Sequence, residues 1–146
     1  MSLTDFQRPL NTRGKSDGPL MANYLSIKFN KIDYLHSSSS VRTFETSKFF
    51  INQINFKKIE YDDALYHSSA ISILNLIKDY SDEYQSVTII AHNPGLTNLI
   101  NELTNISLDN LPMTGLAEIK FNSDSWADIS CENSSLIDLK FPKQLK

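Results

Sequence analysis

Two residues, His92 and Arg42, combine side chains that bind phosphate with positions that favour an anion. His92 ends the apolar run 87–91 and precedes Asn-Pro-Gly, which predicts a helix start because Asn93 can accept an orphan backbone N–H and Pro94 suits the first turn. Arg42 opens another predicted helix, where the helix dipole favours an anion over a cation. A bound anion would resolve this conflict, since guanidinium and imidazole donate charge-assisted hydrogen bonds to phosphoryl oxygens.

The elements that must position these residues alternate between strand and helix. Apolar spacing predicts helices at about 12–29, from about 41, at 69–80 and from 94, with strands at 33–36, 57–61 and 87–91. Polar and apolar residues then alternate in three segments, which predicts an antiparallel meander of strands at 116–121, 126–130 and 136–141.

This order predicts an α/β fold with a mainly parallel sheet flanked by helices and a C-terminal antiparallel meander. Parallel strands deliver their carboxyl ends to one edge of a sheet, where ligands gather. We therefore expect His92 and Arg42, together with the serine-rich loop 37–40, to form a single anion site.

Composition limits the classes of protein to consider. The 146 residues are 40% hydrophobic, which predicts one globular domain over residues 1–146. A formal net charge of -3 argues against broad nucleic-acid binding. A single cysteine, the absence of an apolar run near the ~20 residues that span a bilayer, and an N-terminus without a signal-peptide core predict a cytoplasmic protein that does not enter a membrane.

Each candidate residue also has a simpler interpretation. His92 alone fits a satisfied core histidine equally well, and Arg42 alone fits a solvated surface residue. His36 and His67 lack metal-ligand spacing with His92, so we expect no metal site and no cofactor. No glycine-rich phosphate loop follows a predicted strand, which argues against a nucleotide-binding domain. The residues therefore indicate an oxyanion pocket and leave the reaction open.

Five blocks of sequence extend this interpretation. In order, DFQRPLNTRGKSDGPLMANYL, SSSSVRTFETSKFF, DALYHSS, SVTIIAHNPGLTNLINELT and DNLPMTGLAEIKF resemble successive blocks of the SixA-type phosphohistidine phosphatases, in the histidine phosphatase (phosphoglycerate-mutase-like) superfamily. The resemblance covers nearly the whole chain. It implies that Arg42, His92 and the backbone N–H of Asn93 bind phosphate. It also implies metal-free phosphoryl transfer through a phosphohistidine intermediate, from a phosphorylated protein or a small phosphate ester to inorganic phosphate.

The N-terminus departs from this family. Members normally begin with a strand followed by Arg-His-Gly or Arg-His-Ala, whose histidine is the nucleophile, but only Met-Ser-Leu precedes TDFQRPLN here. We therefore expect the chain to be N-terminally incomplete, without its first central strand and with no nucleophile. Neither His36 nor His67 matches the motif. A smaller departure is Ala91, where the family usually has glycine.

Two hypotheses follow. The chain is a phosphatase impaired by the loss of its nucleophile, or it is a non-catalytic phosphate-binding or interaction protein derived from the same fold.

Overall fold

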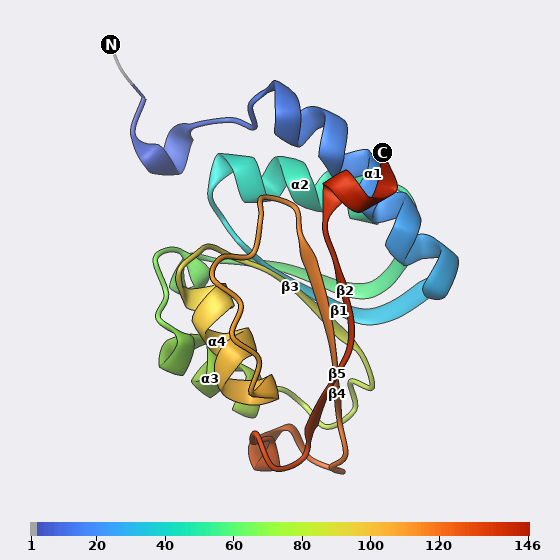
Figure 1. The fold of residues 1–146 in the computed structure, drawn as a ribbon, viewed down its shortest axis with the longest axis vertical. Helices are drawn as coiled ribbons and strands as arrows, with labels where there is room; N and C mark the ends of the chain where they lie inside the picture. Colours follow the sequence, from blue (N-terminus) through green and yellow to red (C-terminus); the bar gives the residue numbers. More distant parts are fainter. Residues whose placement is uncertain (1–2) are drawn as a thin grey trace.

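A computed structural model of the chain describes residues 3–146, in which a parallel sheet lies between two layers of helices (Figure 1). The strand order of this three-stranded sheet is β2 (Asn55–Asp62), β1 (Lys31–Ser38), β3 (Val87–Ile90). Both neighbours of β1 run parallel to it. The carboxyl ends of all three strands therefore meet at one edge, as predicted.

Helices cover both faces of this sheet. Helices α1 (Thr12–Lys28) and α2 (Val41–Ile51) lie on one face, and α3 (Ala70–Lys78) and α4 (Gly95–Thr104) lie on the other (Figure 1). Each face has its own apolar core. The first core includes the fully buried Met21 and Leu35, and the second includes the fully buried Leu65 and Ile73. Full burial of such a side chain contributes roughly 1.5–3 kcal/mol, so the cores hold the helices firmly on the sheet.

Two helix starts show how local residues set the geometry near the sheet edge. Helix α1 begins at Thr12, where the Asn11 side chain accepts from the backbone N–H of Gly14 at 2.9 Å, and it contains Pro19 without a delayed start. Helix α4 begins at Gly95, and the Asn93 side-chain oxygen accepts from the Thr97 N–H at 3.2 Å. The predicted capping role of Asn93 is therefore confirmed.

Gly95 allows the loop before α3 to approach the start of α4. A Cβ atom at this position would lie 2.1 Å from the backbone oxygen of Ser68. No side chain fits at that distance, so only glycine lets the two segments come this close. This contact brings the loop 63–69 beside the end of β3.

The C-terminal region forms a second sheet. Strands β4 (Leu116–Phe121) and β5 (Ser134–Lys140) pair in antiparallel fashion. The prediction of a middle strand of the meander, 126–130, is wrong, because Trp126–Asp128 form a 3-10 helix.

The reason for this error is tertiary. The Trp126 backbone N–H donates to the Asp82 carboxylate at 2.9 Å, and its indole N–H donates to the Tyr84 carbonyl at 2.9 Å. The Trp126 ring packs against the second core. A tryptophan on a strand would bury its ring in the same way, so the sequence pattern looks the same. The alternation of apolar and polar residues in 126–130 therefore results from the burial of Trp126 and does not indicate a strand.

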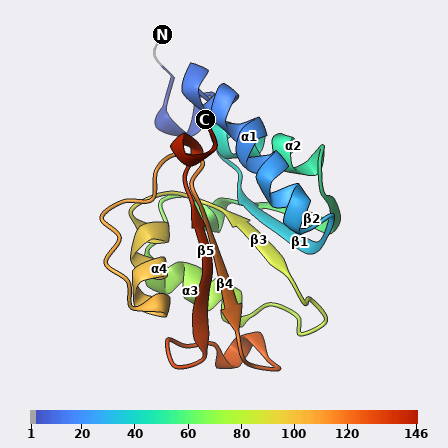
Figure 2. The same ribbon diagram turned by 45° about the vertical axis from the view of Figure 1, so that its right-hand side comes forward.

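Strands β3 and β4 each have an unpaired edge within residues 3–146, since β3 pairs with β1 and β4 pairs with β5. In Figure 2, β4 lies on the β3 side of the parallel sheet. Both strands contribute to both cores: Ile90 and Leu116 pack against the first, and Ile89 and Ile119 against the second. The two sheets therefore belong to one layer. All four residues of β3 remain partly exposed.

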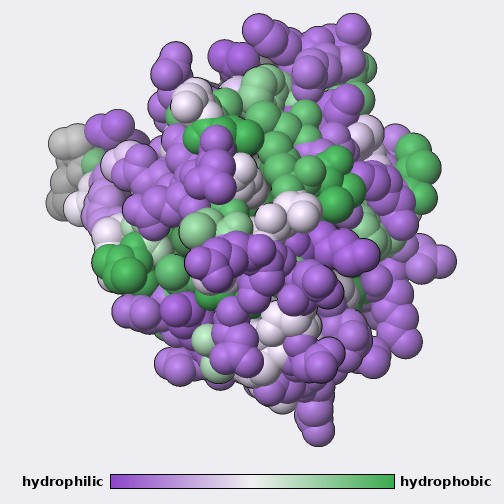
Figure 3. Space-filling view, turned by 60° about the horizontal axis from the view of Figure 1, so that its bottom comes forward, coloured by the Kyte–Doolittle hydropathy of each residue, from purple (hydrophilic) through white to green (hydrophobic). Residues whose placement is uncertain are grey.

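The surface is otherwise mixed in character. Hydrophilic side chains surround a band of hydrophobic ones on the face shown in Figure 3. Among the described residues, no helix is long and apolar enough to cross a membrane.

Candidate anion-binding site

Arg42 and His92 lie side by side at the carboxyl edge of the parallel sheet. The Arg42 Nη2 and His92 Nδ1 atoms are 3.3 Å apart, although 50 residues separate the two in sequence. Arg42 lies in the first turn of α2, which follows β1. His92 lies just beyond the end of β3, whose last residue is Ile90. The prediction that these side chains meet is confirmed, and its physical reason is the parallel pairing of β1 with β3.

His92 is a neutral imidazole held between two partners. Burial, followed by the nearby charges of Arg42 and His67, lowers the pKa of His92 to about 4. Arg42 can only donate, so Nδ1 of His92 accepts and the ring proton lies on Nε2. That nitrogen is 2.9 Å from the Ser38 hydroxyl oxygen. His92 therefore presents an N–H in a polar, half-buried site at neutral pH.

Next to His92 lie the last residue of β1, Ser38, and the first turn of α2 with its N-cap Ser40. The hydroxyls of Ser40 and Thr43 lie 2.7 Å apart, and Thr43 donates to the Ser38 carbonyl at 2.8 Å. All three residues are buried. Polar groups buried in this way form a fixed network, which holds the ends of β1 and α2 in one geometry.

The anion that balances Arg42 is the carboxylate of Asp5. Two parallel contacts of 3.1 Å join the guanidinium to Oδ1 and Oδ2, and Nη1 also donates to the Asp5 carbonyl at 2.8 Å. Hydrogen bonds from Tyr66 and then Arg42 lower the pKa of Asp5 to about 2. The sequence led us to expect a bound anion beside Arg42, whereas in the structure an internal carboxylate balances this charge. Asp5 was missed because no spacing along the chain links these two residues.

The loop 63–69 supplies two further aromatic groups. The Tyr66 hydroxyl donates to Asp5 Oδ2 at 2.6 Å, and its ring meets the His92 ring edge-on, with centroids 5.1 Å apart. The His67 ring centroid lies 6.5 Å from that of His92. His67 has a φ of 55°, a left-handed conformation that costs free energy in a residue other than glycine. Sequence analysis left both residues out of the site.

A cavity of about 240 Å³ adjoins this loop. Its lining mixes polar and apolar atoms and comes from the loop, the start of α3 and the segment that leads into α4. The residues that line it are His67, Ser68, Ser69, Ala70, Asn93, Pro94, Gly95 and Asn98.

His36 occupies a different environment, although it lies on the same sheet. It is buried, with Nε2 2.8 Å from Asp62 Oδ2 and Nδ1 2.5 Å from the Tyr80 hydroxyl. Both ring nitrogens are thus paired inside the protein, which fits a structural role. Asp62, the last residue of β2, therefore pairs with a buried histidine inside the sheet region. Over residues 3–146, no group of three or more His, Cys, Asp or Glu side chains could hold a metal ion.

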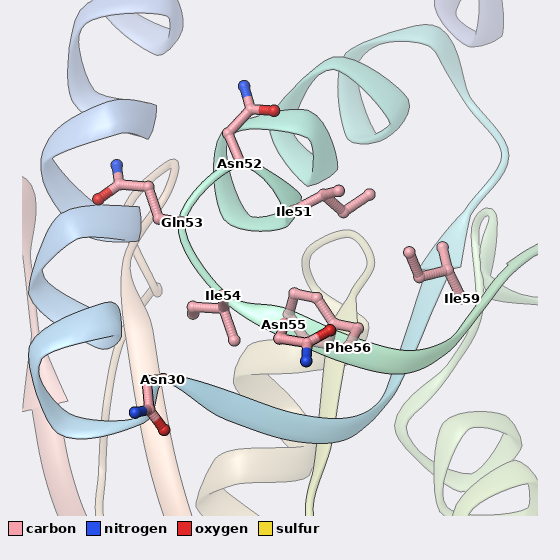
Figure 4. A pocket seen from close by; sticks show the side chains of 8 residues that line it. All are labelled: Asn30, Ile51, Asn52, Gln53, Ile54, Asn55, Phe56 and Ile59. Carbon is pink, nitrogen blue, oxygen red and sulfur yellow. The ribbon is translucent and has the colours of Figure 1, made fainter.

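A larger cavity of about 430 Å³ lies at the amino edge of the sheet (Figure 4). Amide and apolar side chains line it, and none of these residues is ionisable. They are Asn30, Ile51, Asn52, Gln53, Ile54, Asn55, Phe56 and Ile59.

Solved structures identify the fold. No protein-family model matches the chain. The structure titled as the phosphohistidine phosphatase SixA from Nakamurella multipartitia is 18% identical, with a TM-score of 0.84 over 97% of this chain and 89% of its own. The corresponding protein from Agrobacterium tumefaciens is 23% identical, with a TM-score of 0.80 over 97% and 88%. A protein histidine phosphatase SixA complexed with tungstate is 21% identical, with a TM-score of 0.81 over 100% and 92%.

The chain therefore has the same fold as these SixA structures, a parallel sheet flanked by helices, as its sequence predicted. A curated relative, the uncharacterized protein ML1117 of Mycobacterium leprae (strain TN), is 22% identical over 97% of this chain and 91% of its own length.

Proposed function

We propose that this protein is a phosphatase of the phosphohistidine or phosphomonoester class. The observation that carries the proposal is the position of the Arg42 guanidinium, which binds the Asp5 carboxylate with two hydrogen bonds and lies beside the neutral His92 imidazole. Both side chains lie at the carboxyl edge of the parallel sheet, where ligands bind in folds of this kind. The substrate is a phosphorylated protein or a small phosphate ester, and the product is inorganic phosphate. The free thiol of Cys131, which is exposed, suits a reducing compartment such as the cytoplasm.

Each residue has a stated task in this proposal. Arg42 binds two phosphoryl oxygens through its fork, in the geometry that it uses for the Asp5 carboxylate. In this proposal the Nε2 proton of His92 exchanges its contact with the Ser38 hydroxyl, at 2.9 Å in the structure, for a third phosphoryl oxygen and stabilises the charge that develops there. The Asn93 backbone N–H is a further donor. A phosphoryl group bound here raises the pKa of His92, because an adjacent anion favours the protonated ring.

Within residues 3–146, neither His36 nor His67 lies in the motif that carries the nucleophile in the SixA-type phosphatases. Covalent transfer needs an imidazole in line with the scissile P–O or P–N bond. His36 is excluded because it is buried and paired with Asp62 and Tyr80. We propose a histidine within an Arg-His-Gly or Arg-His-Ala motif, on a strand that pairs with β3 and β4.

Two features of the fold support that placement. The edges of β3 and β4 are unpaired within residues 3–146, and both strands already pack against the same two cores. A strand parallel to β3 in this position ends beside His92, since β3 itself ends there. The proposal therefore predicts that the 146-residue chain binds phosphate but turns over little or no substrate.

The test compares this chain with one that carries an added apolar strand ending in Arg-His-Gly. Single-turnover release of phosphate from phosphohistidine or an aryl phosphate is measured for both, together with acid-labile phosphoprotein. We expect turnover only in the extended chain. There, His92→Ala lowers the rate by about 10² to 10⁴-fold, because a donor to the transferring oxygens is lost. Robust turnover by the 146-residue chain, unchanged by His92→Ala, would contradict the proposal.

The second candidate is a non-catalytic phosphate-binding or interaction protein. It is favoured by one observation, the Asp5 carboxylate that occupies the Arg42 fork in place of a ligand. Phosphate binding by the extended chain without acid-labile phosphoprotein or turnover would support this candidate over the enzyme.

A further inference from the structure

Every polar contact of the Asp5 carboxylate is with a group that also suits a phosphoryl oxygen. Among the described residues, its two oxygens receive hydrogen bonds from the Arg42 guanidinium and the Tyr66 hydroxyl. Oδ2 receives one from each, at 3.1 Å from Nη2 and 2.6 Å from the phenol oxygen. The ring of His92 lies beside both donors. This is the donor set of an oxyanion site, and it is occupied by a side chain.

The carboxylate and an external anion cannot use the Arg42 fork together. Both terminal nitrogens of Arg42 point at Asp5, and Nη2 also contacts His92. A phosphoryl group therefore reaches this fork only by displacing Asp5. A carboxylate and a phosphoryl group both present two oxygens to a guanidinium, so the exchange keeps the bidentate geometry.

The segment that carries Asp5 lies on the surface. The 3-10 helix Asp5–Gln7 contains no buried residue, and the Asp5 side chain is 49% exposed. Its other contact with the loop is the edge-on packing of Phe6 against Tyr66, with ring centroids 4.9 Å apart. Arg42 holds the segment through both Asp5 carboxylate oxygens and the Asp5 carbonyl, so an incoming anion must replace these contacts. Because the segment buries no residue, its displacement does not disturb the cores.

We propose that Asp5 is an internal stand-in for the phosphoryl group, and that an incoming phosphate displaces it and takes over hydrogen bonds from both Arg42 and Tyr66. Tyr66 is thus a further phosphate-binding residue. This inference rests on the phosphate site proposed above and adds to it a binding residue and a competing anion.

The first experiment removes the competitor. Inorganic phosphate is titrated into the 146-residue chain and its Asp5→Asn and Asp5→Ala variants by calorimetry. We expect both variants to bind phosphate about 10-fold more tightly, which corresponds to about 1.4 kcal/mol. The matched control is Asp124→Asn, which makes the same change of charge at an exposed loop residue, and we expect it to leave the affinity unchanged.

The second experiment removes the new donor. In the Asp5→Ala background, Tyr66→Phe deletes only a hydroxyl, and we expect it to weaken phosphate binding about 5- to 10-fold. The control is Tyr24→Phe, whose hydroxyl contacts Asp138 and not the site. Unchanged affinity in Tyr66→Phe would remove this residue from the site.

One result would overturn the displacement itself. If Asp5→Asn and Asp5→Ala bind phosphate equally or more weakly, Asp5 holds Arg42 in place and does not compete with the ligand. Arg42→Ala separates this failure from failure of the proposed function. When Arg42→Ala loses phosphate binding, only the role of Asp5 is wrong; when it does not, the phosphate site itself is wrong.

Discussion

The two ends of the parallel sheet differ in a way that cavity size does not reveal. The amino end has the larger cavity, about 430 Å³ against about 240 Å³, but amides and apolar side chains line it (Figure 4). The carboxyl end brings together Arg42, His92, Asp5 and Tyr66. Helices that follow parallel strands point their positive ends at this edge, so charge and donors converge here and not at the amino end.

The surroundings of two histidines also differ: His36 lies on β1, and His92 follows the neighbouring strand β3. His36 pairs with the Asp62 carboxylate and is buried, whereas His92 faces the Arg42 guanidinium and is half-buried. A carboxylate neighbour stabilises an imidazole in place. A cationic neighbour keeps it neutral and available for an anion that can bridge the two. The sign of the neighbouring charge therefore separates the buried, paired His36 from His92, the histidine that we propose binds phosphate.

The largest expected effect is stabilisation by phosphate, which we expect to depend on a residue at the carboxyl end of the sheet and not on one at the amino end. Phosphate at ~100 times its dissociation constant stabilises the folded chain by about 2.7 kcal/mol. Arg42→Ala should lose most of this stabilisation, because the fork is removed. Asn52→Ala, at the larger cavity, should keep it. Thermal melts with and without phosphate or vanadate measure the difference, and a chelator should change neither variant. Equal stabilisation of both variants would place the anion elsewhere.

The second effect is a difference in the free energy of unfolding between the alanine variants of His36 and His92. His36→Ala removes the partner of the Tyr80 hydroxyl and of Asp62 Oδ2 and opens a cavity at a buried position, so it should cost roughly 2 kcal/mol or more in the free energy of unfolding. His92→Ala should cost less, because that ring is only half-buried. Urea denaturation of both variants gives the order. A greater loss in His92→Ala would show that this ring is the structural one.

The pH dependence of stability should show the lowered pKa of His92. Its folded pKa of about 4 lies below the ordinary histidine value of 6.5, so the unfolded chain binds the proton first. This contribution to stability is complete above pH 6.5 and falls as the pH drops toward 4, by about 1 kcal/mol after allowing for solvent exposure.

His92→Gln should lack this slope. Asp5 contributes to a different pH range, because its pKa is lowered from 3.8 to about 2. Its contribution to stability is therefore lost as the pH falls from about 3.8 to about 2, below the range in which His92 acts. Urea denaturation at several pH values measures the slope. Parallel curves for the two proteins between pH 4 and 6.5 would contradict the assigned state of His92.

The smallest effect concerns the loop 63–69. His67 contributes less than Arg42 to the lowering of the His92 pKa. His67→Asn keeps a residue that tolerates a left-handed conformation, and it should raise the pKa of His92 slightly. Arg42→Ala should raise that pKa more. NMR titration of the imidazole protons checks the order, and the reverse order would place His67 closer to His92 in solution than Arg42.

Elements next to strong local signals could be predicted from sequence. Asn93 and Pro94 marked the start of α4, and the serine-rich loop marked the passage from β1 to α2. Local signals failed at Trp126, where alternating polarity came from packing against the second core and not from a strand. They also failed at His67, whose approach to His92 depends on Gly95 lying against the Ser68 carbonyl.

The sequence by itself determined the order of strands and helices, and through it the meeting of Arg42 and His92, because parallel pairing sends every strand end to one edge. Only the tertiary structure decided which groups surround them. Asp5 reaches Arg42 across 37 residues, and Tyr66 reaches Asp5 across 61. Such contacts depend on how loops fold over a finished sheet, where side-chain hydrogen bonds and packing act between residues that no periodicity connects.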